Sequence, residues 1–178
     1  DVRERKCDQV IEGHHGGVLG IAMDPPALAA VTAGQDGIVK VWDVRARRCT
    51  HTIQGHQGPV NAICMTEDCR VAISGGEDRT LRVWHPGSGK LIATFEGHQA
   101  PVRAVAIGYN GKLAASCGLD RTVRLWDVAT GRCLNTLTGH AHETTGVAFP
   151  RDLKQMFSSS RDKKAAAWCL GITKDGHT

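Results

Sequence analysis

The sequence predicts an all-β protein made of repeated units of four short strands. Gly-His recurs at positions 13, 55, 97 and 139, so each pair lies 42 residues after the one before it. Tryptophan keeps the same spacing at 42, 84, 126 and 168, and aspartate keeps it at 36, 78, 120 and 162. Three residue types that hold one period four times over indicate an internal structural repeat.

Within each unit, the residue pattern is typical of strands separated by tight turns. The segments 38–42 and 122–126 are rich in β-branched and aromatic residues, and Asp-Gly, Asn-Gly and Gly-Ser-Gly turn signals occur at short intervals. In the second unit we expect strands at roughly 60–65, 70–75, 80–85 and 90–95. No segment of the sequence has the period of a long amphipathic helix.

Gly-His followed by Trp-Asp, at a period of about 40–45 residues, resembles the WD40-repeat family. Trp-Asp is intact at positions 42–43 and 126–127, and it becomes Trp-His at 84–85 and Trp-Cys at 168–169. The resemblance implies a β-propeller of four-stranded blades. We expect the repeats to span 13–54, 55–96, 97–138 and 139–178, the last of them incomplete, with 1–12 as the last strand of a preceding blade.

We expect the chain to be an arc of a larger propeller. The segment 1–7 matches 43–49 at an offset of 42, which places a fourth strand near 6–11, whereas 171–178 is a poor match to a closing strand. Propellers of this family commonly have about seven blades. We expect the missing blades to come from the same longer protein, with two chains paired into an eight-bladed ring as the alternative.

Each unit also repeats a set of four polar residues: a histidine 22 positions before the aspartate, a hydroxyl residue four positions before it, and the tryptophan. The sets are His14, Thr32, Asp36 and Trp42; His56, Ser74, Asp78 and Trp84; His98, Ser116, Asp120 and Trp126; and His140, Ser158, Asp162 and Trp168. The resemblance implies that these are structural tetrads. An indole N–H can only donate, so a chain from indole to hydroxyl to imidazole to carboxylate would leave no buried polar group unpaired.

Serine, histidine and aspartate also make up a hydrolase triad, but we expect no catalysis. Each hydroxyl is expected to be occupied by an indole, and no Gly-x-Ser-x-Gly elbow is present. The segment 87–91 lacks the glycine spacing and the hydroxyl residue of a phosphate-binding loop. The paired histidines near 14 and 140 have no further ligand at zinc-binding spacing. We therefore expect no cofactor, no metal site and no small-molecule substrate.

Composition limits the cellular compartment and the kinds of partner that we expect. The seven cysteines are odd in number and form no Cys-x-x-Cys, so free thiols in a reducing compartment are expected, in the cytoplasm or alternatively the nucleus. No apolar run approaches the ~20 residues of a membrane span. The net charge is only +4, and the basic segment 45–48 has no interleaved aromatic residues, so we do not expect a nucleic-acid partner.

In the family pattern, the positions exposed on the top face lie three and five residues after the histidine and one before the aspartate. The partner-binding residues expected from this pattern are Leu19, Gln35, Asn61, Glu77, Arg103, Leu119, Glu143, Thr145 and Arg161. Such a mixture of apolar and charged side chains suits a protein or peptide partner. We therefore expect a non-catalytic interaction scaffold, or the sensing domain of a larger WD-repeat protein.

One short motif leaves an alternative open. Trp42, Asp43 and Arg45 resemble the WDxR box of propellers that dock on cullin-type ubiquitin-ligase adaptors. If the motif is used, the protein is a substrate receptor of such a ligase.

Overall fold

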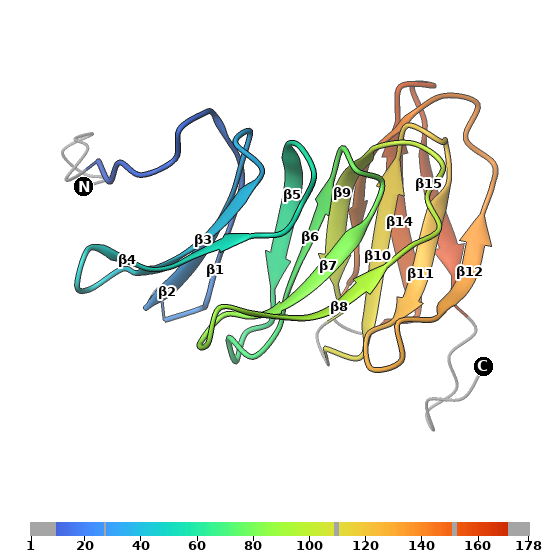
Figure 1. Cartoon of the computed structure of the whole chain (residues 1–178). Coiled ribbons are helices and arrows are strands. Elements are labelled where there is room, and N and C mark those ends of the chain that lie inside the picture. The colour runs from blue at the N-terminus through green and yellow to red at the C-terminus, as the bar shows by residue number, and fades with distance from the viewer. Residues whose placement is uncertain (1–9, 27, 109–110, 151–152, 171–178) are drawn as a thin grey trace, which may run out of the picture.

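The computed structural model describes residues 10–26, 28–108, 111–150 and 153–170, and within these ranges it contains strands and no helix. Fifteen strands form four antiparallel sheets that stand in a row (Figure 1). In every sheet the strands are paired in sequence order, because a short turn joins each strand to the next. The prediction of an all-β chain of repeated blades is confirmed.

Each sheet is one blade. The first contains β1 (Val18–Met23), β2 (Ala29–Gly34), β3 (Ile38–Asp43) and β4 (Arg48–Gln54). The second contains β5 (Val60–Met65), β6 (Ala72–Gly76), β7 (Leu81–His85) and β8 (Lys90–Phe95). The third contains β9 (Val102–Ile107), β10 (Leu113–Gly118), β11 (Val123–Asp127) and β12 (Cys133–Leu137). The fourth contains β13 (Thr144–Ala148), β14 (Gln155–Ser160) and β15 (Ala165–Cys169).

The strands of the second blade begin and end within two residues of the positions expected from the sequence. Two other expectations fall largely or wholly outside the described residues. These are the fourth strand near 6–11, of which only 10 and 11 are described, and the segment 171–178.

Neighbouring blades pack face to face, and their first strands lie next to one another. β1 contacts β5, β5 contacts β9, and β9 contacts β13. The first and last blades stand at opposite ends of the row in Figure 1, so the four blades form an open arc. Successive side chains of a strand point to opposite faces, so the consecutive buried residues of central strands such as β2 and β3 give a blade an apolar face toward each neighbour.

The hydrophobic core therefore lies between the blades. Val31 and Val39 of the first blade pack with Val60 and Trp84 of the second. The next two interfaces repeat this arrangement. The second and third blades are joined by a cluster that includes Ile73, Leu81, Val102 and Trp126. The third and fourth are joined by Ala115, Cys117, Val123 and Met156, with smaller residues and a thinner core.

One face of the first blade is uncovered. Val18 and Ile21 are 55% and 63% exposed, whereas their equivalents 42 residues later, Val60 and Ile63, are 0% and 8% exposed between two blades. A hollow of about 550 Å³ lies over this face, and its lining includes Trp42. The sequence of the first blade thus provides the same apolar surface that the second and third blades bury.

We predict that Val60→Ala lowers the free energy of unfolding by about 2 kcal/mol, because the missing methyl groups leave a void between two packed sheets. Val18→Ala is the matched control, since it removes the same atoms from the equivalent but exposed position, and it should cost less than about 0.5 kcal/mol. Urea denaturation measures both. Equal losses would show that the face of the first blade is covered in solution.

Candidate functional site

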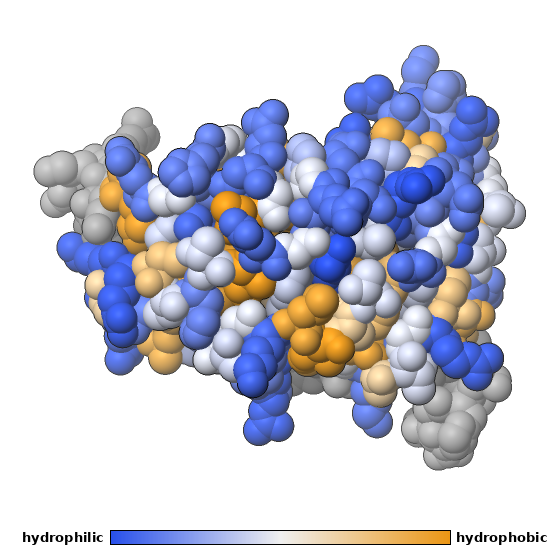
Figure 2. Space-filling view, in the orientation of Figure 1, coloured by the Kyte–Doolittle hydropathy of each residue, from blue (hydrophilic) through white to orange (hydrophobic). Residues whose placement is uncertain are grey.

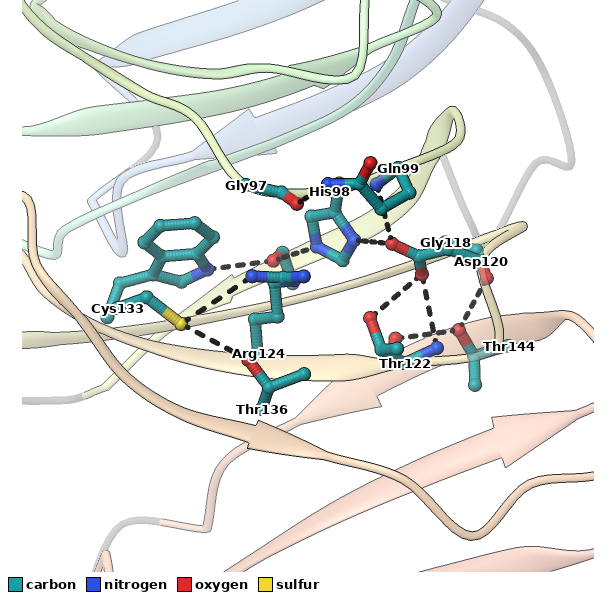
Figure 3. Close-up of polar contacts among 12 residues, drawn as sticks. Gly97, His98, Gln99, Gly118, Asp120, Thr122, Arg124, Cys133, Thr136 and Thr144 are labelled. Carbon is teal, nitrogen blue, oxygen red and sulfur yellow. Dashed lines mark hydrogen bonds and ion pairs between the residues drawn. The ribbon is translucent and has the colours of Figure 1, made fainter.

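In each blade, four side chains form a hydrogen-bonded chain that runs from the third strand to two turns. The third blade shows it in Figure 3. The indole Nε1 of Trp126 donates to the Ser116 hydroxyl at 2.8 Å, and that hydroxyl lies 2.6 Å from Nε2 of His98. The other ring nitrogen of His98, Nδ1, is 2.7 Å from the Asp120 carboxylate.

The other three blades repeat this chain with nearly the same geometry. The distance from indole to hydroxyl is 2.8 Å in each of them. The distances from hydroxyl to imidazole are 2.7, 2.7 and 2.8 Å in the first, second and fourth blades. Those from imidazole to carboxylate are 3.0, 3.0 and 2.9 Å. The structure therefore brings the residues of all four sets together.

The direction of each hydrogen bond follows from the two ends of the chain, because the indole can only donate and the ionised carboxylate can only accept. Nδ1 of the neutral His56 ring therefore donates to Asp78, and Nε2 is left as an acceptor. The Ser74 hydroxyl, which accepts the Trp84 indole N–H, then donates its own proton to Nε2 of His56. Ser74 is completely buried and needs a partner for each polar group. This ordering leaves no polar atom of the four hydrogen-bonded side chains without a partner.

The aspartate at the end of the chain also fixes the backbone of two turns. Oδ2 of Asp120 accepts the N–H of Gln99 at 3.0 Å, and Oδ1 accepts the N–H of Thr122 at 3.1 Å and its hydroxyl at 2.8 Å. The other three aspartates accept the same pair of backbone N–H groups. One carboxylate in each blade thus holds together the turn before the first strand and the turn between the second and third strands.

These two kinds of turn form one edge of every blade, which we call the top face. The connecting turns, which precede the first strands, are 10–17, 55–59, 96–101 and 138–143. The hairpin turns, between the second and third strands, are 35–37, 77–80, 119–122 and 161–164.

Glycine before the histidine permits the close approach of the connecting turn to the tryptophan. A Cβ atom added at Gly55 would lie 2.5 Å from Cη2 of Trp84, closer than two carbon atoms can pack. A Cβ at Gly13 would lie 2.7 Å from the same atom of Trp42. The Gly-His pairs of the sequence therefore have a steric as well as a polar basis.

The environment sets the charge states within the chain. Burial favours a raised pKa for Asp120, but the hydrogen bond and charge of His98 and the N–H of Gln99 outweigh it and hold the pKa well below its usual range. The pKa of His56 is lowered by burial, more than the Asp78 carboxylate raises it. At neutral pH, Asp120 is therefore ionised and His56 is neutral.

The arrangement does not present a nucleophile to solvent. Ser74 and Ser116 have no exposed surface, and each hydroxyl already accepts one hydrogen bond and donates another. In the part of the chain that the structure describes, no three side chains of histidine, cysteine, aspartate or glutamate cluster in a way that could hold a metal ion.

Five of the residues expected to bind partners make specific contacts near the top face. Asn61 donates from Nδ2 to Glu77 at 3.1 Å and to the carbonyl of Val102 at 2.8 Å, and Nη1 of Arg103 lies 3.4 Å from Glu77. This cluster joins the second blade to the third. A separate ion pair joins Arg161 to Glu143 in the fourth blade at 3.4 Å.

The other expected partner-binding residues differ in exposure. Leu19, Gln35 and Thr145 are exposed, and Leu119 is half-buried. The hydroxyl of Thr145 lies 3.0 Å from the hydroxyl of Ser159.

The sequence analysis missed Thr144, which is buried between the third and fourth blades. Its hydroxyl donates to the carbonyl of Gly118 at 2.9 Å and lies 3.3 Å from the carbonyl of Thr122. The signal was a break in the repeat, since valine stands at the equivalent positions of the other three blades.

The residues of the WDxR motif have separate surroundings. The indole of Trp42 is buried in the hydrogen-bonded chain of the first blade, and Asp43 accepts the N–H of Ala46 at 2.8 Å to close the turn after β3. Arg45 is exposed on this turn, at the opposite edge of the blade from the top face.

A family model described as WD domain, G-beta repeat matches the chain at 5–43, 47–85, 89–127 and 131–169. The chain belongs to the WD40-repeat family. Each matched segment ends at or near the end of the third strand of a blade. Domains of this family are in general non-catalytic scaffolds for protein interactions. No curated protein matches the chain at a significant level.

In the described part of this WD40 chain, the structure contains no helix that is long and apolar enough to span a membrane.

We predict that Trp84→Phe lowers the free energy of unfolding by about 1–3 kcal/mol, because it removes the donor that orders the Ser74 hydroxyl and the groups behind it. Ser116→Ala should lower it in the same way in the third blade. Chemical denaturation of the whole protein checks both variants. Midpoints equal to the wild type would show that these hydrogen bonds do not stabilise the blades.

We also predict that stability falls with acidification in two steps. The folded pKa of His56 is lower than its ordinary value of 6.5, so its contribution is complete above that pH and decreases as the pH falls below it. The lowered pKa of Asp120 acts the same way below 3.8.

Urea denaturation at pH 7.5, 5.5 and 3.5 measures both steps. His56→Gln should reduce the difference between pH 7.5 and 5.5, because the titrating ring is gone. A wild-type protein that is more stable at pH 5.5 than at pH 7.5 would contradict this assignment.

Proposed function

We propose that this WD40 domain is a non-catalytic scaffold or sensing domain that binds proteins or peptides through its top face. The observation that carries the proposal is the pair of exposed arginines, Arg103 and Arg161, each held by one carboxylate. Arginine is enriched among the residues that dominate binding energy, and its guanidinium can form several hydrogen bonds with a partner.

The rigidity of the turns supports the same surface. Asp78 and Asp120 fix the backbone of the turns near Glu77 and Arg103, so side chains there are positioned before a partner arrives. Pre-positioned groups lose less conformational freedom on binding, and this increases affinity. The hydroxyls of the four sets are all engaged in hydrogen bonds with an indole and an imidazole, which supports a binding role over a hydrolytic one.

The uncovered face of the first blade supports a larger assembly of blades. Val18 and Ile21 are exposed there, at positions that the second blade buries against its neighbour. We propose that another blade packs on this face and belongs to the same polypeptide, with a second copy of the chain as the alternative.

An intracellular location is part of the proposal. The cysteines in the described ranges are all free thiols, and Cys117 is buried as a small apolar residue. Unpaired thiols are usual in a reducing compartment.

We predict that Arg103→Glu and Arg161→Glu each reduce capture of partner proteins from a lysate of the source cells by at least about tenfold, without lowering the melting temperature. Both side chains are exposed and lie outside the hydrophobic core, and each variant loses one exposed ion pair, which contributes little to stability. Arg45→Glu on the opposite edge is the matched control. Loss of capture in the Arg45→Glu control alone would contradict the proposal, because it would place the binding surface on the edge opposite the top face.

The ligase-receptor alternative is tested in the same experiment. Co-purification of a cullin adaptor with the wild type, and its loss in the Arg45→Glu variant, would favour that function over a general scaffold. The exposed guanidinium of Arg45 is the feature that favours this alternative.

A further inference from the structure

The hairpin turns carry a basic residue at the same position in three successive blades. Arg79, Arg121 and Lys163 occupy this position, and Gly37 occupies it in the first blade. Their φ angles are +66°, +64° and +68°, and that of Gly37 is +79°. A residue with a Cβ atom is disfavoured in this left-handed region, whereas glycine is not. The backbone of these turns therefore accepts glycine, and the three cationic side chains have no role in shaping it.

These cations are exposed and uncompensated. Arg79, Arg121 and Lys163 form no ion pair with any residue that the structure describes, and the neighbouring Lys164 forms none either. The carboxylates of the same hairpin turns are all engaged. Glu77 pairs with Arg103, and the aspartates at 78, 120 and 162 bind histidine rings and backbone N–H groups. The charge left free on these turns is positive.

The three turns form one continuous row. The Glu77–Arg103 contact joins the second blade to the third, and Thr144 joins the hairpin turn of the third blade to the fourth through the carbonyl groups of Gly118 and Thr122. In Figure 1 the turns β6–β7, β10–β11 and β14–β15 follow one another along the upper edge. Hydrophilic residues cover this edge in Figure 2.

We propose that this row of cations binds an acidic segment of a partner protein, in which carboxylates recur along an extended chain. The proposal rests on the top-face function above and names the chemistry of its partner. Carboxylates match a row of guanidinium and ammonium groups that have no internal partner. The three hairpin turns contain no aromatic side chain on which nucleic-acid bases could stack, so a peptide is favoured over a single-stranded nucleic acid.

The combined variant Arg79→Gly, Arg121→Gly and Lys163→Gly separates binding from folding. It removes three charges at positions where glycine relieves the backbone, so the melting temperature should stay the same or rise. Arg47→Gly is the matched control. Arg47 is also an exposed cation with a positive φ, +56°, but it lies on the turn between β3 and β4 at the opposite edge.

Binding is measured by fluorescence anisotropy with a labelled peptide of alternating Glu and Gly, and with a Gln-Gly peptide of equal length. The wild type and Arg47→Gly should bind the Glu-Gly peptide and not the Gln-Gly peptide, with affinity that falls as salt is added. The combined variant should bind the Glu-Gly peptide at least about tenfold more weakly. Unchanged binding in the combined variant, or equal binding of the two peptides, would overturn the proposal. So would tighter binding of a single-stranded oligonucleotide of equal charge.

Capture of natural partners distinguishes this proposal from the broader one. If Arg103→Glu loses partners while the combined glycine variant keeps them, the top face binds proteins but not through this row. If both variants keep their partners, the top-face function is wrong as well.

Discussion

An indole N–H that is buried between two sheets must find an acceptor, and this requirement organises every blade. The tryptophans of the second and third blades are each only 1% exposed. Their acceptors are hydroxyls on the adjacent second strand, and the proton of each buried hydroxyl in turn needs an acceptor, which the histidine and then the aspartate of the chain provide. The aspartate then binds the backbone of two turns. The burial of the indole in the core is thereby linked to the backbone conformation of the top face.

A blade of this kind cannot stand alone. Its central strands present apolar side chains on both faces, so each face needs a neighbouring blade, and the core is distributed over the interfaces between blades. The interfaces are not equal. Trp84 and Trp126 are fully enclosed, whereas Trp168 of the three-stranded fourth blade is only half-buried. Within the described residues, packing is therefore less complete at that blade, and the first blade displays an apolar face at the other end.

The repeat made much of this predictable from the sequence. A period of 42 residues shared by Gly-His, aspartate and tryptophan determined the blades, and donor and acceptor chemistry then indicated which side chains belong together. Contacts that involve the backbone were not predictable in this way. The N–H groups bound by Asp120 and the carbonyl groups bound by Thr144 belong to residues of any type, so no residue pattern marks them. The Glu77–Arg103 pair was also hidden, because it depends on how two blades are placed relative to each other.

The most direct test of the hydrogen-bonded chain is the position of the proton on each histidine ring, which long-range ¹⁵N–¹H NMR correlations of the protein at pH 8 report. If each chain runs from an indole that can only donate to a carboxylate that can only accept, then His14, His56, His98 and His140 carry the proton on Nδ1 and leave Nε2 as the acceptor. Free imidazole side chains exchange between the two forms, so a fixed Nδ1–H signal for these four rings is the result expected here. Rings protonated on Nε2, or rings that average between the two forms, would contradict a hydrogen-bonded chain that runs from indole to carboxylate.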